Sequence, residues 1–166
     1  MPILDDGRHV EVLFNTLGVV NRLNSMQLYE QSLNCIGNRI LERVLDNSFD
    51  IDYRLGLIKK VYRIFNDKQA VAYEAFVNSL DSEGLHNHLK ELKETGIVFV
   101  IEPMWHDKYL FEKMKDFYTD ETFKFVKPYD VYVNRFGRKI KMMGQHYVGE
   151  MYIMRLQQTS EKGFSA

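Results

Sequence analysis

Asn15-Thr16-Leu17-Gly18-Val19-Val20-Asn21-Arg22-Leu23-Asn24-Ser25-Met26-Gln27 is the most informative stretch of the 166-residue chain. Within it, Asn24 can cap a helix, and Gln27 stands where a capping box is completed. The apolar side chains that follow recur at helical spacing, so the sequence predicts a helix from residue 24 to about residue 45. Arg22 therefore stands just before a helix N-terminus, where unpaired backbone N–H groups and the helix dipole favour an anion.

Two roles are open for Arg22 from the residues alone. Its guanidinium can strengthen a phosphate site at the helix start, because arginine donates paired hydrogen bonds to phosphate oxygens. It can instead pair with a carboxylate or with backbone carbonyl groups, which is a structural role.

The stretch around Arg22 resembles N-P-x-G-V-P-S-R-M-N-x-G-Q of the β subunit, the second-largest subunit, of multisubunit DNA-dependent RNA polymerases. Residues 1–8 look like that family's M-P-x-x-x-D-G segment, and residues 148–156 are similar to V-G-Y-M-Y-M-L-K-L. More weakly, residues 96–105 look like G-x-P-I-A-T-P-V-F-D-G. The resemblance predicts a fragment from the C-terminal half of a β subunit.

The resemblance also implies a function. Arg22 matches the arginine that is implicated in contacting the triphosphate of the incoming nucleotide. The chain is then expected to take part in transcription, as a piece of a nucleotidyltransferase near the nucleotide site and the RNA–DNA hybrid. Its expected partners are the remaining β segments, the β′ subunit, the DNA template, the RNA transcript and NTPs. No cofactor is expected on this chain, since the catalytic Mg²⁺ is held by another subunit, and the isolated fragment is expected to be inactive.

Several positions depart from the family pattern. Thr16 and Val20 stand where the family usually has proline, so the loop before Arg22 is less constrained. The family's H-x-V-D-D-K-x-H-A-R-S run is largely replaced after residue 156. With these departures the chain looks more like part of a divergent viral polymerase, such as those of large bacteriophages, in which the β subunit is often split between genes.

Composition limits the classes of function. The chain has 22 Lys and Arg against 23 acidic residues, a net charge of −1, which argues against a free-standing polyanion binder but allows a local basic surface. The single cysteine, Cys35, excludes an internal disulfide and is expected to be a packed thiol in a reducing compartment. Without a signal peptide or a spanning apolar run, the expected location is cytoplasmic, in a host cell or a virion if the source is a phage.

The patterning predicts an α+β fold. Helical periodicity covers most of residues 24–95, with Ser82 as one cap and Gly96 as the last stop, and then gives way to short apolar runs. The expected architecture is a small mixed sheet built from both ends of the chain, with residues 1–45 and 96–166 as one domain and residues 46–95 as a helical insert. The expected strands are residues 10–14, 97–101, 123–126, 130–133 and 147–156, and a further helix is expected at 107–117.

A basic set surrounds a predicted hairpin turn at residues 134–138, which occupies the place of the family's Y-D-G-R-T-G-E. Its candidate nucleic-acid contacts are Arg135, Arg138, Lys139 and Lys141. The residues interleaved with them or close to them in sequence are Lys124, Lys127, Tyr129, Tyr132 and Phe136. A solvated hairpin edge that lysines protect from aggregation explains the same pattern. His86 and His88, which lie two residues apart on a predicted helix, are expected to be a surface pair rather than a metal site.

Two functions remain open from the sequence. One is a β-subunit segment inside a polymerase, and the other is a stand-alone interaction or regulatory module derived from one. Genes for the upstream and downstream β segments in the same genome would favour the first.

Overall fold

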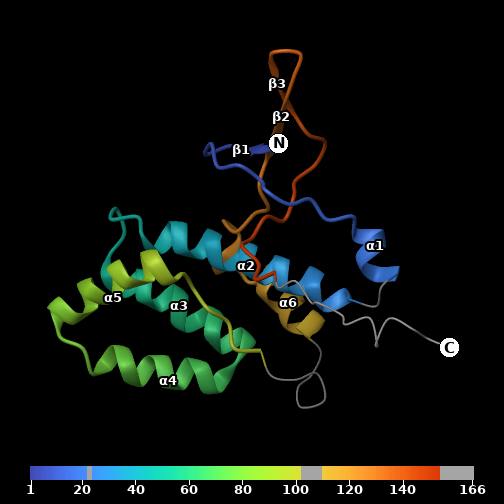
Figure 1. Ribbon diagram of the computed structural model, residues 1–166. Coiled ribbons are helices and arrows are strands. Elements are labelled where there is room, and N and C mark those ends of the chain that lie inside the picture. The colour runs from blue at the N-terminus through green and yellow to red at the C-terminus, as the bar shows by residue number, and fades with distance from the viewer. Residues whose placement is uncertain (22–23, 102–109, 154–166) are drawn as a thin grey trace, which may run out of the picture.

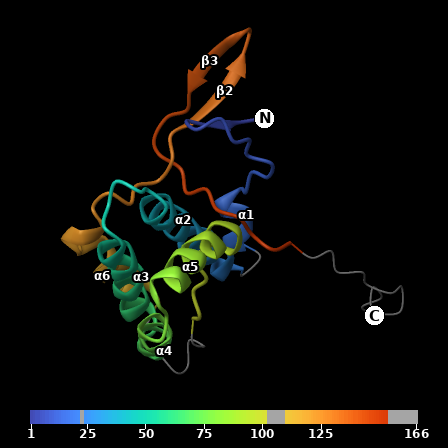
Figure 2. The same cartoon turned by 90° about the vertical axis from the view of Figure 1, so that its left-hand side faces the viewer.

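A computed structural model describes residues 1–21, 24–101 and 110–153. Over these residues the chain folds into six α-helices, one short 3₁₀-helix and a three-stranded antiparallel sheet. Figures 1 and 2 show the β2–β3 hairpin projecting away from the helices, with β1 beside its base. The predicted α+β class is confirmed, and the sheet does combine strands from both ends of the chain, although all its pairings are antiparallel.

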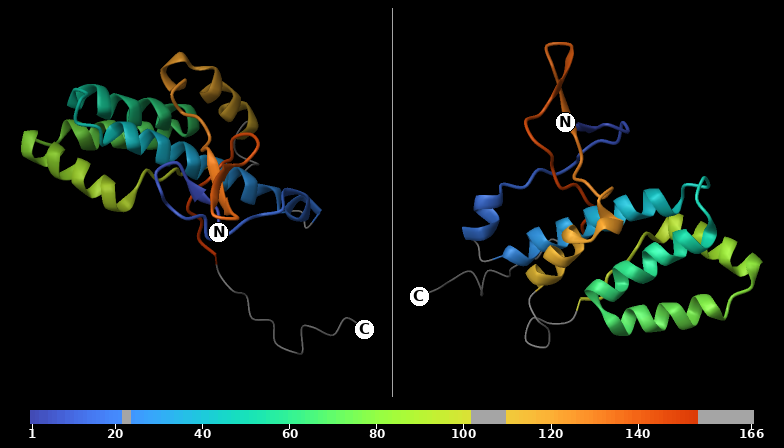
Figure 3. Two further views of the ribbon diagram at one scale, coloured as in Figure 1. Left: turned by 90° about the horizontal axis from the view of Figure 1, so that it is seen from above. Right: turned by 180° about the vertical axis from the view of Figure 1, so that it is seen from behind.

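The helical part is built around an apolar core. Its helices are α2 (Ser25–Val44), α3 (Ile51–Phe65), α4 (Asp67–Asn78), α5 (Ser82–Thr95) and α6 (Leu110–Thr119). Helix α3 lies between α4 on one side and α2 and α6 on the other (Figure 3), and its Ile58, Val61 and Phe65 are almost fully buried. The helices predicted between residues 24 and 95 are confirmed. The division into an α+β domain and an insert at residues 46–95 stays a prediction.

The helix ends differ in part from the expected caps. Asp81, rather than Ser82, caps α5 by accepting a hydrogen bond from the Gly84 N–H at 2.7 Å. Gly96 ends α5 as predicted, with a φ of 73° that glycine adopts at low cost. The predicted capping box at the start of α2 is wrong, since the side chain of Asn24 makes no capping hydrogen bond.

The sheet runs in the order β1 (Ile3–Leu4), β2 (Val131–Arg135), β3 (Arg138–Lys141). The strand predicted at residues 10–14 is wrong. A tight turn folds the first residues back, with the Leu4 N–H donating to the Arg8 carbonyl at 2.8 Å, and Ile3–Leu4 thereby take the place beside β2. Residues 16–21 then form α1 (Thr16–Asn21), a short helix that contains Gly18.

The strand predicted at 130–133 and the turn after it are confirmed. The strand is β2, and Phe136 and Gly137 form the turn to β3. A second apolar cluster packs the sheet onto α2 and contains Leu4, Val10, Cys35, Tyr129 and Val131. Cys35 is 1% exposed, which confirms the packed thiol.

Two segments predicted as strands are extended chain, and neither has a neighbouring strand among the residues that the structure describes. Over residues 97–101, Gln69 replaces that neighbour: its amide nitrogen donates to the Val98 carbonyl at 2.7 Å, and its oxygen accepts from the Val100 N–H at 2.9 Å. Residues 147–150 are held to α2 in the same manner, by Gln31 and Asn34, which donate to the carbonyls of Tyr147 and Glu150. Side-chain amides thus satisfy backbone groups that a sheet would otherwise pair.

Two further expectations need correction. Residues 123–126 are not a strand, because Glu121–Phe123 form the 3₁₀-helix η1 and a turn follows it. The helix predicted at 107–117 is observed at Leu110–Thr119, and its expected start and the end of the strand predicted at 147–156 lie outside the described residues. No helix in the described ranges is long and apolar enough to cross a membrane.

Candidate functional site

Arg22 lies outside the described residues, between the end of α1 at Asn21 and the start of α2 at Ser25. Only the residues on either side of this connection are described. Asn24 is exposed, and its backbone N–H donates to the Val19 carbonyl at 3.1 Å, which ties the start of α2 to α1. Since the Asn24 side chain does not cap α2, the connection that contains Arg22 leads into a helix start without a side-chain cap.

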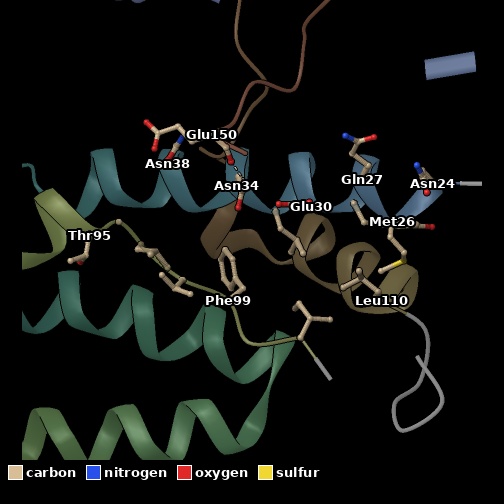
Figure 4. A pocket seen from close by; sticks show the side chains of 16 residues that line it. Asn24, Met26, Gln27, Glu30, Asn34, Asn38, Thr95, Phe99, Leu110 and Glu150 are labelled. Carbon is tan, nitrogen blue, oxygen red and sulfur yellow. Dashed lines mark hydrogen bonds between the residues drawn. The ribbon is translucent and has the colours of Figure 1, made fainter. Parts of the chain in front are cut away.

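The same end of α2 opens onto a groove of about 800 Å³ between α2 and the extended segment after α5. Figure 4 shows polar side chains of α2 along one wall, and Phe99 and Leu110 on the other side. The α2 wall consists mainly of Asn24, Gln27, Glu30, Asn34 and Asn38. Sequence reasoning missed this groove, because polar residues at spacings of three and four along a helix indicate only a face that meets solvent.

The base of the hairpin is fixed to α2 by a charged and aromatic cluster. The Arg39 guanidinium carbon lies 3.5 Å from the centre of the Tyr129 ring, and that of Arg8 lies 5.5 Å from it. The Tyr129 hydroxyl donates to Glu42 at 2.9 Å, and Glu42 also pairs with both arginines. Burial, together with the hydrogen bond to Glu42, raises the pKa of Tyr129 to about 12, so its hydroxyl stays protonated.

The structure brings the four predicted hairpin residues onto β2 and β3 but gives them different surroundings. Lys141 is paired with Asp130 at 2.5 Å, which raises the pKa of the Lys141 ammonium. The Lys139 ammonium lies over the Tyr132 ring, 4.4 Å from its centre. Arg135 and Arg138 are exposed cross-strand partners nearest the turn.

Lys124 and the two histidines have partners within the chain. Lys124 pairs with Glu121, one helical turn away. His86 bonds to the Ser82 carbonyl at 2.7 Å and His88 to the Tyr73 hydroxyl at 3.0 Å, so the two imidazoles have separate partners. Burial lowers the pKa of His88. In the described ranges, no group of three His, Cys, Asp or Glu residues is placed to hold a metal ion.

Comparison with known proteins gives one consistent result. No protein-family model matches the chain. The chain is similar to DNA-directed RNA polymerase subunit beta of Geobacter sulfurreducens, 33% identical over 96 residues, and of Geotalea daltonii, 34% identical over 96 residues. Each match covers 56% of this chain and 7% of the relative. The subunit beta of Cyanidioschyzon merolae is 39% identical over 69 residues, which is 42% of this chain and 6% of that protein.

The chain therefore spans only about 7% of the length of the two bacterial relatives. Similarity over about half the chain supports a β-subunit-like fragment, in agreement with the resemblance found in the motifs. A bacteriophage source stays a prediction.

Proposed function

We propose that this chain is a segment of a DNA-directed RNA polymerase β subunit that contributes to the nucleotide site and to the RNA–DNA hybrid region during transcription. The observation that carries the proposal is the similarity to several polymerase β subunits. The partners are the remaining β segments, the β′ subunit, the DNA template, the transcript and NTPs. The cytoplasm is the proposed location.

In the proposed mechanism Arg22 binds the triphosphate of the incoming nucleotide. Its support is the motif match and the adjoining start of α2, where backbone N–H groups and the helix dipole favour anionic oxygens. Template-directed phosphoryl transfer depends on positioning and on electrostatic stabilisation of the charge that develops on the phosphates. The Mg²⁺ of that reaction is held by another subunit, and this chain supplies positive charge rather than a catalytic residue.

The hairpin is the proposed contact with nucleic acid. Arg135 and Arg138 are exposed, and no carboxylate among the described residues pairs with them. Lys139 is also exposed, while Lys141 is engaged by Asp130 and so contributes less positive charge to a phosphate. Electrostatic contact with backbone phosphates requires cations of this kind, and it would be weakened by added salt.

The test uses the assembled polymerase with Arg22→Ala. A charge-assisted contact that strengthens in the transition state contributes about 2–4 kcal/mol, so elongation should slow and the apparent KM for NTPs should rise. Arg22→Lys should restore only part of the activity, because an ammonium cannot donate a paired bond to two phosphate oxygens.

Thermal melting of the Arg22→Ala chain is the control for folding. Unchanged nucleotide dependence in the assembled mutant would contradict the proposal. So would loss of assembly or folding at every nucleotide concentration, because that result assigns Arg22 a structural role. Template-dependent incorporation by the purified 166-residue chain alone would contradict its proposed place as one part of a larger enzyme.

A further inference from the structure

The turn between β2 and β3 carries a phenylalanine where the backbone favours asparagine or glycine. Phe136 has a φ of 50° and Gly137 a φ of 71°, so both central residues of the turn are left-handed. Two-residue turns of this kind prefer Asn-Gly, Asp-Gly or Gly-Gly, since a bulky side chain at positive φ is sterically disfavoured. Phe136 therefore costs the isolated chain conformational free energy.

No packing within the described structure offsets this cost. Phe136 is 91% exposed at the tip of a hairpin that projects away from the helices (Figure 1). The neighbour of its ring is Arg135, whose guanidinium carbon lies 5.5 Å from the ring centre. A strained and exposed aromatic residue is better explained by contact with a partner than by folding.

The charges beside the tip indicate an anionic partner. Arg135 and Arg138 are direct cross-strand neighbours, and like charges in that position repel each other. Residues 131–141 contain no Asp or Glu, and within the described part of the chain neither arginine has an ion-pair partner. A phosphate group between the two guanidinium groups would relieve this repulsion.

We propose that the hairpin tip binds single-stranded nucleic acid, with Phe136 stacked on an unpaired base and Arg135 and Arg138 bound to the adjacent phosphates. The inference deepens the proposed nucleic-acid contact of the same hairpin and rests on it. A single strand is required because an aromatic ring reaches the face of a base only where that base is not stacked within a duplex.

The decisive variant is Phe136→Asn, because it separates binding from stability. Asparagine suits the left-handed turn, so the melting temperature should stay unchanged or rise. Loss of one stacked base should weaken binding about tenfold. The probes are fluorescein-labelled oligothymidylate and oligouridylate of about ten nucleotides, measured by fluorescence anisotropy on the 166-residue chain, and the stronger binder of the two distinguishes DNA from RNA as the source.

Two controls are matched to this experiment. Phe136→Trp keeps an aromatic face and should keep the affinity, whereas Phe111→Ala removes a 63% exposed ring from α6 and should change nothing. Affinity falls as salt is added, and the double variant Arg135→Glu, Arg138→Glu should make this fall less steep. The slope of log affinity against log salt should shrink in magnitude by about 0.7 for each phosphate that the tip no longer binds. Lys90→Glu, Lys93→Glu makes the same change in net charge on α5 and should have a much smaller effect.

The inference would be overturned if neither oligonucleotide bound, if Phe136→Asn kept the wild-type affinity, or if a duplex bound as tightly as a single strand. It would also be overturned if Lys90→Glu, Lys93→Glu on α5 reduced the salt dependence as much as the arginine double variant. Loss of co-purifying polymerase subunits in the tip variants, without any oligonucleotide binding, would also overturn it and make the hairpin a protein contact. These outcomes leave the Arg22 elongation test standing. Conversely, a failed Arg22 test beside tip-dependent oligonucleotide binding would refute the proposed nucleotide contact and not the tip.

Discussion

Gly149→Ala should destabilise the fold, because Gly149 lies against the backbone of α2. A Cβ atom at this position would stand 2.7 Å from the Asn34 Cβ and 3.0 Å from both the Cys35 nitrogen and the Gln31 carbonyl oxygen. The Asn34 Cβ and the backbone atoms of α2 cannot move aside as the end of a flexible side chain can. The glycine of the V-G motif is thus explained by close approach of two backbone segments.

The expected magnitude follows from what the added methyl group must displace. Forcing an extra carbon into a packed contact costs about 1–3 kcal/mol. If residues 147–150 lift from α2 instead, the hydrogen bonds from Gln31 and Asn34 break, at about 1 kcal/mol each. Either route gives a destabilisation of about 2 kcal/mol, which lowers the melting temperature of a protein of this size by roughly 4–8 °C.

The measurement is thermal and urea denaturation followed by circular dichroism, with Gly56→Ala as the matched control. Gly56 lies within α3, and a Cβ there would meet nothing within 4 Å. Alanine is the better helix former, so this control should gain up to about 1 kcal/mol. The reasoning is refuted if Gly149→Ala melts at the wild-type temperature or shifts in the same direction as the control.

Three further outcomes are expected. Gln69→Ala should lower the free energy of unfolding by about 1–3 kcal/mol, since the Val100 N–H and the Val98 carbonyl lose their hydrogen-bonding partner. Hydrogen exchange of the Val100 amide should become faster, and an unchanged exchange rate would contradict this. The Lys60 hydrogen bond lowers the pKa of Asp120 from 3.8 to about 2, so the ionised Asp120 carboxylate stabilises the fold above about pH 4, and this stabilisation is lost as pH falls toward 2. Urea titrations at several pH values should show a change of about 1 kcal/mol in the free energy of unfolding, after solvent screening is allowed for. The Asp120→Asn variant should lack this pH dependence. Burial raises the pKa of the Cys35 thiol, so a colorimetric thiol reagent should react with it rapidly only after denaturation, and fast reaction of the folded chain would disprove the packed thiol.

The helices could be predicted because their signals are local. Ile58, Val61 and Phe65 recur at spacings of three and four, and in the structure this stripe is the buried face of α3. An α-helix closes its backbone hydrogen bonds within one segment, so periodicity alone determines both the element and the face that it buries. The exact caps were less predictable, since Asp81 and Ser82 are both good N-cap residues.

The strands were harder because a strand is defined by a partner elsewhere in the chain. Residues 97–101 have the branched apolar composition of a strand and are extended, but Gln69 takes the place of the neighbouring strand. Residues 147–150 depend in the same way on Gln31 and Asn34. Nothing local to these segments distinguishes a strand partner from a side-chain amide, so the sequence predicted the backbone conformation and missed its hydrogen-bonding partner.

The candidate site shows the same division between local and non-local information. The hairpin turn was predictable from Asn134 and Gly137, and the basic composition was visible around it. Register determines the rest: it places Arg135 opposite Arg138 at the tip, and the fold pairs Lys141 with Asp130. Four cations that looked equivalent in sequence therefore differ in how free they are to bind a phosphate.

Helix α2 connects the two proposed contacts physically. Its start adjoins the connection that contains Arg22, and about four turns further along Arg39 holds Tyr129 at the base of the hairpin. At 1.5 Å per residue these points are about 20 Å apart along one continuous helix. Because Glu42, Arg8 and Arg39 together fix Tyr129 on α2, weakening this cluster would shift the hairpin relative to the start of α2 without breaking the helix itself. The cluster therefore helps to set the position of the hairpin base relative to the start of α2, the two places to which the proposed contacts are assigned.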